Sequence, residues 1–203
     1  MNNITLSGTV LSKPEFSHEL HGEKFYRFVL SSRRTSGTED KLSCIVPQVF
    51  LKKIGECGDK ISITGEIRTR NSDGHLIIFV FVRNVVEYDE DKNAVFIDGF
   101  ICKEPNFRET PLGRQVCDLL VASNRPYGKS DYIPCIVWGR KAIEASEMPM
   151  GREVMILGRL QSRQYEKVSE DGSISAKTAF EVSVSNIEVV GKGEESEGHG
   201  NEN

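Results

Sequence analysis

The chain has 203 residues, of which 38% are hydrophobic and 28% charged, and a formal net charge of −4 at pH 7. Such a composition is ordinary for a folded globular protein and excludes wholesale disorder. No apolar run is long enough to span a membrane, and residues 1–4 lack the basic and apolar regions of a secretion signal. We therefore expect a cytoplasmic protein with no membrane partner. The five scattered cysteines predict neither a zinc site nor a set of disulfides.

The chain repeats itself after about 90 residues. A shift of 91 positions aligns residues 2–8 with residues 93–99, and a shift of 93 positions aligns residues 65–70 with residues 158–163. Two homologous domains are the simplest explanation of such a long-period repeat. The predicted organisation is a first domain, a linker, a second domain and an acidic tail, at residues 1–88, 89–92, 93–190 and 191–203. Because the tail has no apolar residues, it cannot bury enough surface to order itself.

Both domains are predicted to contain five strands and one short helix in the same order. Apolar and β-branched runs mark the strands, and the helix lies between the third and the fourth. In the first domain the strands cover residues 4–11, 25–32, 42–46, 60–68 and 76–86, with the helix at 49–57. In the second domain they cover residues 95–102, 116–123, 132–138, 153–161 and 178–189, with the helix at 141–146. Asp-Gly pairs at 73–74 and 171–172 mark the last hairpin of each domain.

This order of elements favours one fold. Five strands with a helix between the third and the fourth are typical of the OB-fold, a small Greek-key barrel. Glycines in the first and fourth strands fit the bends of barrel strands, and these are Gly8, Gly65, Gly99 and Gly158. An SH3-like barrel also has about five strands, but it does not predict the helix. We therefore expect an all-β chain of two tandem OB-fold barrels.

Four blocks of the second domain carry a resemblance to a known family. They are residues 93–99, Val-Ala-Ser-Asn-Arg at 121–125, Asp-Tyr-Ile-Pro-Cys-Ile-Val-Trp-Gly at 131–139, and Gly-Arg-Leu-Gln-Ser-Arg-Gln-Tyr at 158–165. With these blocks the second domain resembles the bacterial single-stranded DNA-binding proteins, and residues 2–88 look like a diverged copy. The resemblance implies sequence-independent binding of single-stranded DNA, which protects it in replication, recombination or repair. Family members with two folds per chain form dimers, so it also implies a homodimer with four OB-folds.

The resemblance further implies which aromatic side chains stack on bases. The family's stacking positions match Tyr127, Tyr132, Trp138 and Tyr165. Tyr132 and Trp138 are six residues apart, so they lie on one face of an unbroken strand. Every base has a π-face, so stacking does not discriminate between sequences. A tryptophan in an apolar run also fits a core position, and for Trp138 this alternative stays open.

Basic residues near these aromatics are candidates for phosphate contacts, which predict binding that weakens as salt rises. In the second domain the candidates are Arg125, Arg140, Arg159 and Arg163, with Lys129 and Lys141 as weaker ones. The first domain keeps the basic residues Arg33, Arg34, Lys41, Arg68 and Arg70. Its positions equivalent to the four aromatics hold Ser36, Lys41, Pro47 and Ser72. We therefore expect the first domain to bind DNA weakly or to serve in assembly.

Two other functions compete with DNA binding. His18 and His21 would make a weak metal site, but they are more typical of a solvated hairpin tip, and no catalytic or metal motif surrounds them. We therefore expect no enzyme activity, no metal and no cofactor. OB-folds also bind proteins, so the alternative is an interaction module of a replication or primosome assembly with weak nucleic-acid binding. The family's tail ends in an apolar tip that docks partner proteins, and residues 195–203 lack one.

Overall fold

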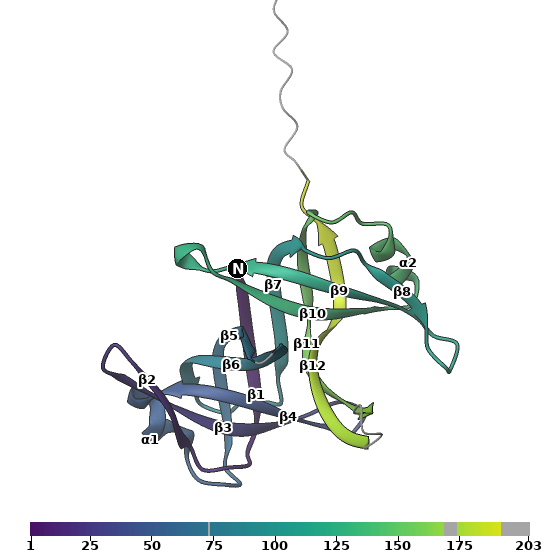
Figure 1. Ribbon diagram of the computed structural model, residues 1–203. Coiled ribbons are helices and arrows are strands. Elements are labelled where there is room, and N and C mark those ends of the chain that lie inside the picture. Colours follow the sequence, from purple (N-terminus) through teal and green to yellow (C-terminus); the bar gives the residue numbers. More distant parts are fainter. Residues whose placement is uncertain (73, 169–173, 192–203) are drawn as a thin grey trace, which may run out of the picture.

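The computed structural model arranges the strands of the two halves of the chain as two barrels (Figure 1). The structure describes residues 1–72, 74–168 and 174–191. The first barrel contains β1 (Asn2–Val10), β2 (Glu15–Leu20), β3 (Glu23–Arg33), β4 (Glu39–Pro47), β5 (Lys60–Ser72) and β6 (His75–Val86). The second contains β7 (Asn93–Ile101), β8 (Asn106–Glu109), β9 (Gln115–Asn124), β10 (Ser130–Trp138), β11 (Glu153–Val168) and β12 (Ile174–Val189).

Both barrels close through the same scheme of strand pairs. In the first, β1 pairs with β3 and β5, β3 pairs with β4, and β5 pairs with β6. The parallel pair β4–β6 closes the ring. The second barrel repeats the scheme with β7, β9, β10, β11 and β12. This is the connectivity of a five-stranded Greek-key barrel, and it confirms the prediction of an all-β chain with two tandem OB-folds. β2 and β8 are hairpin arms added to β3 and β9.

Short helical segments follow β4 and β10, as predicted. The segments η1 (Gln48–Phe50) and α1 (Leu51–Ile54) follow β4, and α2 (Arg140–Ser146) follows β10. A further segment, η2 (Pro126–Gly128), precedes β10. α1 ends before the predicted limit at residue 57, because Gly55 takes a φ of 76°, a left-handed value that does not continue a helix. In the described parts of the chain, no helix has the length and apolarity needed to cross a bilayer.

Alternate strand residues fill the barrel interiors, as expected for a closed sheet. Representative fully buried side chains are Leu6, Phe28, Ile63 and Val80 in the first barrel and Ile97, Val121, Ile133 and Ile156 in the second. Gly8 and Gly99 let the first strand of each barrel cross close to β3 or β9. A Cβ atom at Gly8 would overlap the carbonyl oxygen of Ser31, and one at Gly99 would overlap that of Ala122. These glycines therefore permit barrel closure.

β1 and β7 join the two barrels edge to edge. They pair as antiparallel strands, with Asn2 opposite Ile97, and the described strands thereby form one 12-stranded sheet. The side chains of two equivalent asparagines in these paired strands each bind a neighbouring strand of their own barrel. Asn2 Oδ1 accepts the amide of Ile67 at 2.7 Å, and Asn93 Oδ1 accepts the amide of Leu160 at 2.9 Å. The halves therefore meet in an approximately twofold arrangement.

β11 and β12 extend further toward their connecting turn than the predicted ranges of 153–161 and 178–189. Their pairing continues as far as Val168 opposite Ile174, where polar residues replace the apolar alternation that predicts strands. The turn signal at 171–172 and the acidic tail beyond Gly191 lie outside the described residues. At the equivalent turn of the first barrel, Gly74 has a φ of 74°.

Candidate nucleic-acid interface

A buried aspartate of the second barrel holds the tip of the β5–β6 hairpin of the first. Asp131 is fully buried and pairs with the Arg125 guanidinium. Its carboxylate also accepts the Thr69 amide at 2.6 Å and Arg68 Nη1 at 2.9 Å. Arg125 Nη2 donates to the carbonyl of Thr69 at 3.1 Å, and the amide of Tyr132 donates to Thr69 Oγ1 at 2.8 Å. We call this group of five residues the Asp131 cluster.

The first barrel makes the equivalent contact with the second barrel. Asp40 is buried, and Arg34 donates to it from Nε at 2.7 Å. Asp40 Oδ1 accepts the Ser162 amide at 2.7 Å, while Arg34 Nη2 donates to the Ser162 carbonyl at 2.9 Å. Burial acts to raise the pKa of Asp40, but the hydrogen bonds from Arg34 and Ser162 outweigh it and leave the pKa below its usual value. These three residues form the Asp40 cluster.

Three arginines that we expected to contact phosphates therefore lie at the junction of the barrels. Arg34, Arg68 and Arg125 have side chains only 19%, 12% and 24% exposed. A buried carboxylate needs a cation with good geometry, and the guanidinium fork provides it for Asp40 and Asp131. We therefore reassign these three arginines primarily to holding the barrels together.

A groove of about 590 Å³ runs over the outer wall of the second barrel. Its walls come from β10, β11, β12, the β8–β9 hairpin and one residue of the first barrel. The lining residues are Arg34, Arg108, Thr110, Arg114, Ile136, Trp138, Arg159, Gln161, Ser162, Arg163, Glu181 and Ser183. We call it the Trp138 groove. It contains three of the residues that the sequence singled out in the second domain, which are Trp138, Arg159 and Arg163.

Positive charge dominates this groove. Of the residues that the structure describes there, five are arginines and Glu181 is the one acid. Glu181 accepts Gln161 Nε2 at 2.9 Å, and its other oxygen lies 3.6 Å from Arg163 Nε. Arg159 Nη2 donates to Gln161 Oε1 at 3.3 Å. Gln161 and Glu181 therefore orient the guanidinium groups of Arg159 and Arg163. The two positive charges still outnumber the single carboxylate of Glu181.

The sequence analysis missed two basic residues of the Trp138 groove. Arg108 lies on β8, where it makes two hydrogen bonds to Asp118, at 2.6 and 3.1 Å. Arg114 lies at the end of the β8–β9 turn and also lines the groove. The signal that points to them is the hairpin itself, because Arg108 pairs with Val116 of β9 and Arg114 directly precedes β9, the neighbour of the Trp138 strand.

The aromatic candidates all have exposed rings, so none of them is a core residue. The exposed fractions of Tyr132, Trp138 and Tyr165 are 46%, 39% and 38%. Tyr132 and Trp138 belong to the outward face of β10, as their spacing predicts. The Arg163 guanidinium carbon lies 5.7 Å from the centre of the Tyr165 ring. Tyr127 is 99% exposed, but it lines a different groove on the first barrel.

The remaining basic candidates lie away from the grooves described here. Arg140 is 92% exposed on α2 and faces Glu144 at 3.5 Å. Lys141 donates to the carbonyl of Ser185 at 2.9 Å and to Asn186 Oδ1 at 2.7 Å, which ties α2 to β12. The other exposed candidates, which line neither the Trp138 groove nor the groove beside Tyr127, are Arg33, Lys41, Arg70 and Lys129.

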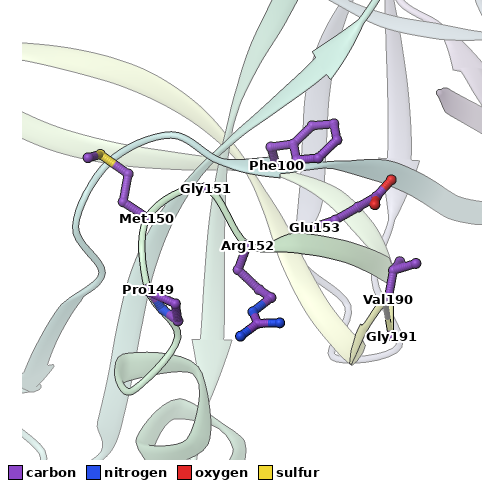
Figure 2. Close-up of a pocket in the computed structure, with 8 residues that line it drawn as sticks. All are labelled: Phe100, Pro149, Met150, Gly151, Arg152, Glu153, Val190 and Gly191. Carbon is purple, nitrogen blue, oxygen red and sulfur yellow. The ribbon is translucent and has the colours of Figure 1, made fainter. Parts of the chain in front are cut away.

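Another hollow, of about 370 Å³, lies where β11 begins and β12 ends. Figure 2 shows that its side chains diverge, with Met150 and Arg152 pointing to opposite sides of the connecting loop. Phe100 and Glu153 lie at its far end. The side chains converge on no common point, so we assign no ligand to it.

The histidines considered as metal ligands have other neighbours. His18 stacks on Phe25, with ring centres 4.9 Å apart and an interplanar angle of 13°. Its Nδ1 lies 3.1 Å from Ser17 Oγ. Within the described ranges, no group of three or more His, Cys, Asp or Glu side chains is arranged to hold a metal ion.

Comparisons with known proteins connect the chain to one family. The model of the Single-strand binding protein family matches residues 92–190. The chain is 34% identical over 87 residues to the single-stranded DNA-binding protein of Oceanobacillus iheyensis, covering 39% of this chain and 53% of that protein. It is 35% identical over 88 residues to that of Clostridium tetani, covering 40% of this chain and 59% of that protein. The chain therefore spans little more than half the length of these relatives.

Among solved structures, the similarity covers both barrels. The wild-type single-stranded DNA binding protein from Thermus aquaticus aligns with a TM-score of 0.75, over 95% of this chain and 94% of that chain. A deletion mutant of that protein aligns with a TM-score of 0.73. The sequence identities are 19% and 20%, so these alignments establish a shared fold of two barrels per chain.

Proposed function

Through residues 92–190 this chain belongs to the Single-strand binding protein family, and we propose that it binds single-stranded DNA regardless of base sequence. Its relatives from Oceanobacillus iheyensis and Clostridium tetani are named for the binding of single-stranded DNA. The role we propose is the protection of strands exposed during replication, recombination or repair, in the cytoplasm. No catalytic step enters this proposal.

The observation that carries the proposal is the content of the Trp138 groove. It places an exposed indole and an excess of guanidinium groups in one concave surface. An unpaired strand offers both matching partners, since its bases are free to stack and its phosphates carry the charge. In duplex DNA the base faces are stacked on one another, so a duplex would contact only the arginines, through its phosphates. The groove therefore favours unpaired strands.

We assign separate roles to the residues that line the groove and to Tyr132 and Tyr165, which lie on β10 and β11 outside its lining. Trp138 and Tyr132 stack bases along the outward face of β10, and Tyr165 extends this surface along β11. Arg159 and Arg163 contact phosphates, together with Arg108 and Arg114 from the hairpin. Hydrogen bonds to base edges are not needed for this mode, which leaves the binding independent of sequence.

Fluorescence of Trp138 tests the proposal directly, because the chain has one tryptophan. We expect titration with oligo-dT to quench it, and added salt to reverse the quenching as counterions compete for the arginines. Replacing both Tyr132 and Tyr165 by Ala should weaken binding by about 1–3 kcal/mol for each lost stack. Absence of quenching, or equal quenching by a duplex of the same length, would contradict the proposal.

We also propose that two chains form a homodimer through the outer face of the second barrel. Leu157 and Met155 on β11 are 49% and 38% exposed, and Phe100 on β7 is 38% exposed. Leu157 is opposite Phe96 across the β7–β11 pair, so these side chains form an apolar surface on one sheet. Apolar residues gathered on an outer sheet face are typical of subunit contacts.

A further inference from the structure

A groove of about 360 Å³ on the first barrel is the counterpart of the Trp138 groove. Its lining residues are His18, Ile45, Arg68, Phe79, Phe81, Arg83, Arg125, Pro126 and Tyr127. The two grooves occupy equivalent places, since Phe81 pairs with Ile45 across β4–β6 as Ser183 pairs with Ile136 across β10–β12. We call this one the Phe81 groove.

The phenylalanine rings of the Phe81 groove come from β6, whereas the ring of the Trp138 groove comes from β10, the equivalent of β4. Phe79 and Phe81 alternate on β6, so both face outward, and both are half-buried. Phe25 lies 5.8 Å from Phe81 between ring centres, and the His18 ring stacks on Phe25. Connected rings therefore form one wall of the groove, although Pro47 occupies the position equivalent to Trp138.

The opposite wall is contributed by the second barrel. Tyr127 projects from the β9–β10 loop with 99% of its surface exposed, and its φ of 66° is a left-handed value that is rare for a tyrosine. Arg125 anchors the start of this loop in the Asp131 cluster. Residues in such unfavourable backbone conformations cluster at ligand-binding positions, and this ring lies beside a groove with its faces open to solvent.

Cations also gather around the Phe81 groove. Arg83 has its guanidinium carbon 4.7 Å from the Phe81 ring centre and a side chain 54% exposed. Arg68 and Arg125 line the groove as well. Glu66 accepts hydrogen bonds from Arg68 and Arg83. Aromatic rings with cations on their faces would bind flat, anionic ligands better than they would bind a purely apolar peptide.

From this arrangement we propose that the Phe81 groove is a second stacking site for single-stranded nucleic acid, built on Phe79 and Phe81 and completed by Tyr127 of the other barrel. The inference rests on the proposed function, because both grooves would hold the same kind of strand. It replaces the expectation, drawn from Ser36, Lys41, Pro47 and Ser72, that the first domain lacks a stacking platform. The platform is present but uses β6 in place of β4.

Relocating the single indole tests this inference in the full-length chain. The background Trp138→Phe keeps a ring in the Trp138 groove and removes its signal. Adding Phe79→Trp or Tyr127→Trp then makes fluorescence report on the Phe81 groove alone. The matched control is Val49→Trp in the same background, because Val49 is 73% exposed on η1 and lines neither groove. Tyr127→Trp changes an exposed side chain, so it remains informative if Phe79→Trp folds poorly.

We expect oligo-dT to quench both groove reporters and to leave the Val49→Trp control unchanged. Quenching of wild-type Trp138 without quenching of either reporter would overturn this inference and leave the proposed function standing. Absence of quenching in the wild-type chain would contradict the proposed function itself.

Removal of the rings gives an independent measurement. Phe79→Ala combined with Phe81→Ala should weaken binding of long oligo-dT by roughly 5- to 150-fold, the equivalent of one lost stack. An oligomer of about 8 nucleotides, short enough for one OB-fold, should still quench Trp138 in this variant. Unchanged affinity for long oligo-dT would show that the groove serves another ligand, such as a peptide, and would overturn the inference.

Discussion

The two barrels share their framework and differ in their grooves. Arg34 and Arg125 form one identical pair and Asp40 and Asp131 another, and both pairs act at the joint between the barrels. The groove residues have diverged, with Trp138 replaced by Pro47 and Ser183 replaced by Phe81. In this internal repeat, the charged residues at the joint are therefore kept in both copies, whereas the aromatic residues of the two grooves differ.

The outer sheet face shows a second difference between the barrels. The apolar positions Phe96, Phe100, Met155 and Leu157 correspond in the first barrel to Thr5, Thr9, Ser62 and Thr64. The surface that we propose for dimerisation is therefore confined to the second barrel. The first barrel meets its neighbour through the shared sheet and the two clusters.

The largest expected effect is a difference in stability between variants of the Asp40 cluster and variants of the Asp131 cluster. Among the described residues, Arg34 is the one basic partner of Asp40, whereas Asp131 has both Arg68 and Arg125. Arg34→Met should therefore lower the free energy of unfolding by about 3–5 kcal/mol, because it leaves a buried carboxylate without a cation. Arg125→Met should cost less, since Arg68 remains.

Urea unfolding measures both changes, with Arg33→Met as the control on an exposed side chain. Equal small losses for Arg34→Met and Arg33→Met would show that the Asp40 cluster contributes little to the joint.

The second prediction concerns the outer face. Leu157→Glu places a charge in the apolar surface of the second barrel and should weaken the dimer by about 2–4 kcal/mol. The matched change Thr64→Glu at the equivalent position of the first barrel should leave the assembly intact. Light scattering over a range of protein concentrations measures the difference. A dimer that survives Leu157→Glu would place the contact elsewhere.

The third prediction compares equivalent positions of the grooves. Trp138→Ala should weaken binding of a labelled oligo-dT by about 1–3 kcal/mol, because one stack is lost. Pro47→Ala, at the matching position of the first barrel, should have no such effect, since the rings of that groove come from β6. Fluorescence anisotropy gives both affinities, and similar losses in the two variants would contradict separate stacking surfaces.

The smallest expected effect is the response of the joint to acid. The pKa of Asp40 lies below its usual value of 3.8, because hydrogen bonds from Arg34 and Ser162 outweigh the effect of burial. A carboxyl with a lowered pKa adds stability above the unfolded value, and this stability is lost as the pH falls through the folded value. Unfolding by urea between about pH 5 and about pH 2 should therefore lose more stability in the wild type than in Asp40→Asn.

Sequence reasoning predicted the architecture because each strand and turn is specified locally. The alternation in residues 60–68 and 153–161 and the turn glycine Gly74 report conformation within a few positions of the chain. The sequence pattern underestimated the length of strands with polar ends, as the continuation of β11 to Val168 shows. Hydrophobic pattern alone does not reveal backbone pairing between polar segments.

The site was predicted only in part because several of its contacts cross between the barrels. Trp138, which the family resemblance indicated, and the nearby basic residues Arg159 and Arg163 do line one groove. By contrast, the role of Arg125 depends on Thr69, which is 56 residues away in the chain. The repeat did contain a usable signal, since Arg34 and Arg125 are kept in both copies although their surrounding aromatics are not.

The pairing of β1 with β7 has a final consequence for how this molecule responds to dilution. Because both strands belong to one polypeptide, their association is intramolecular and does not depend on protein concentration. Even a solitary chain would keep the β9–β10 loop of one half beside the β6 strand of the other. Natural variation can therefore alter one half without imposing the same change on its neighbour, a freedom that identical subunits lack.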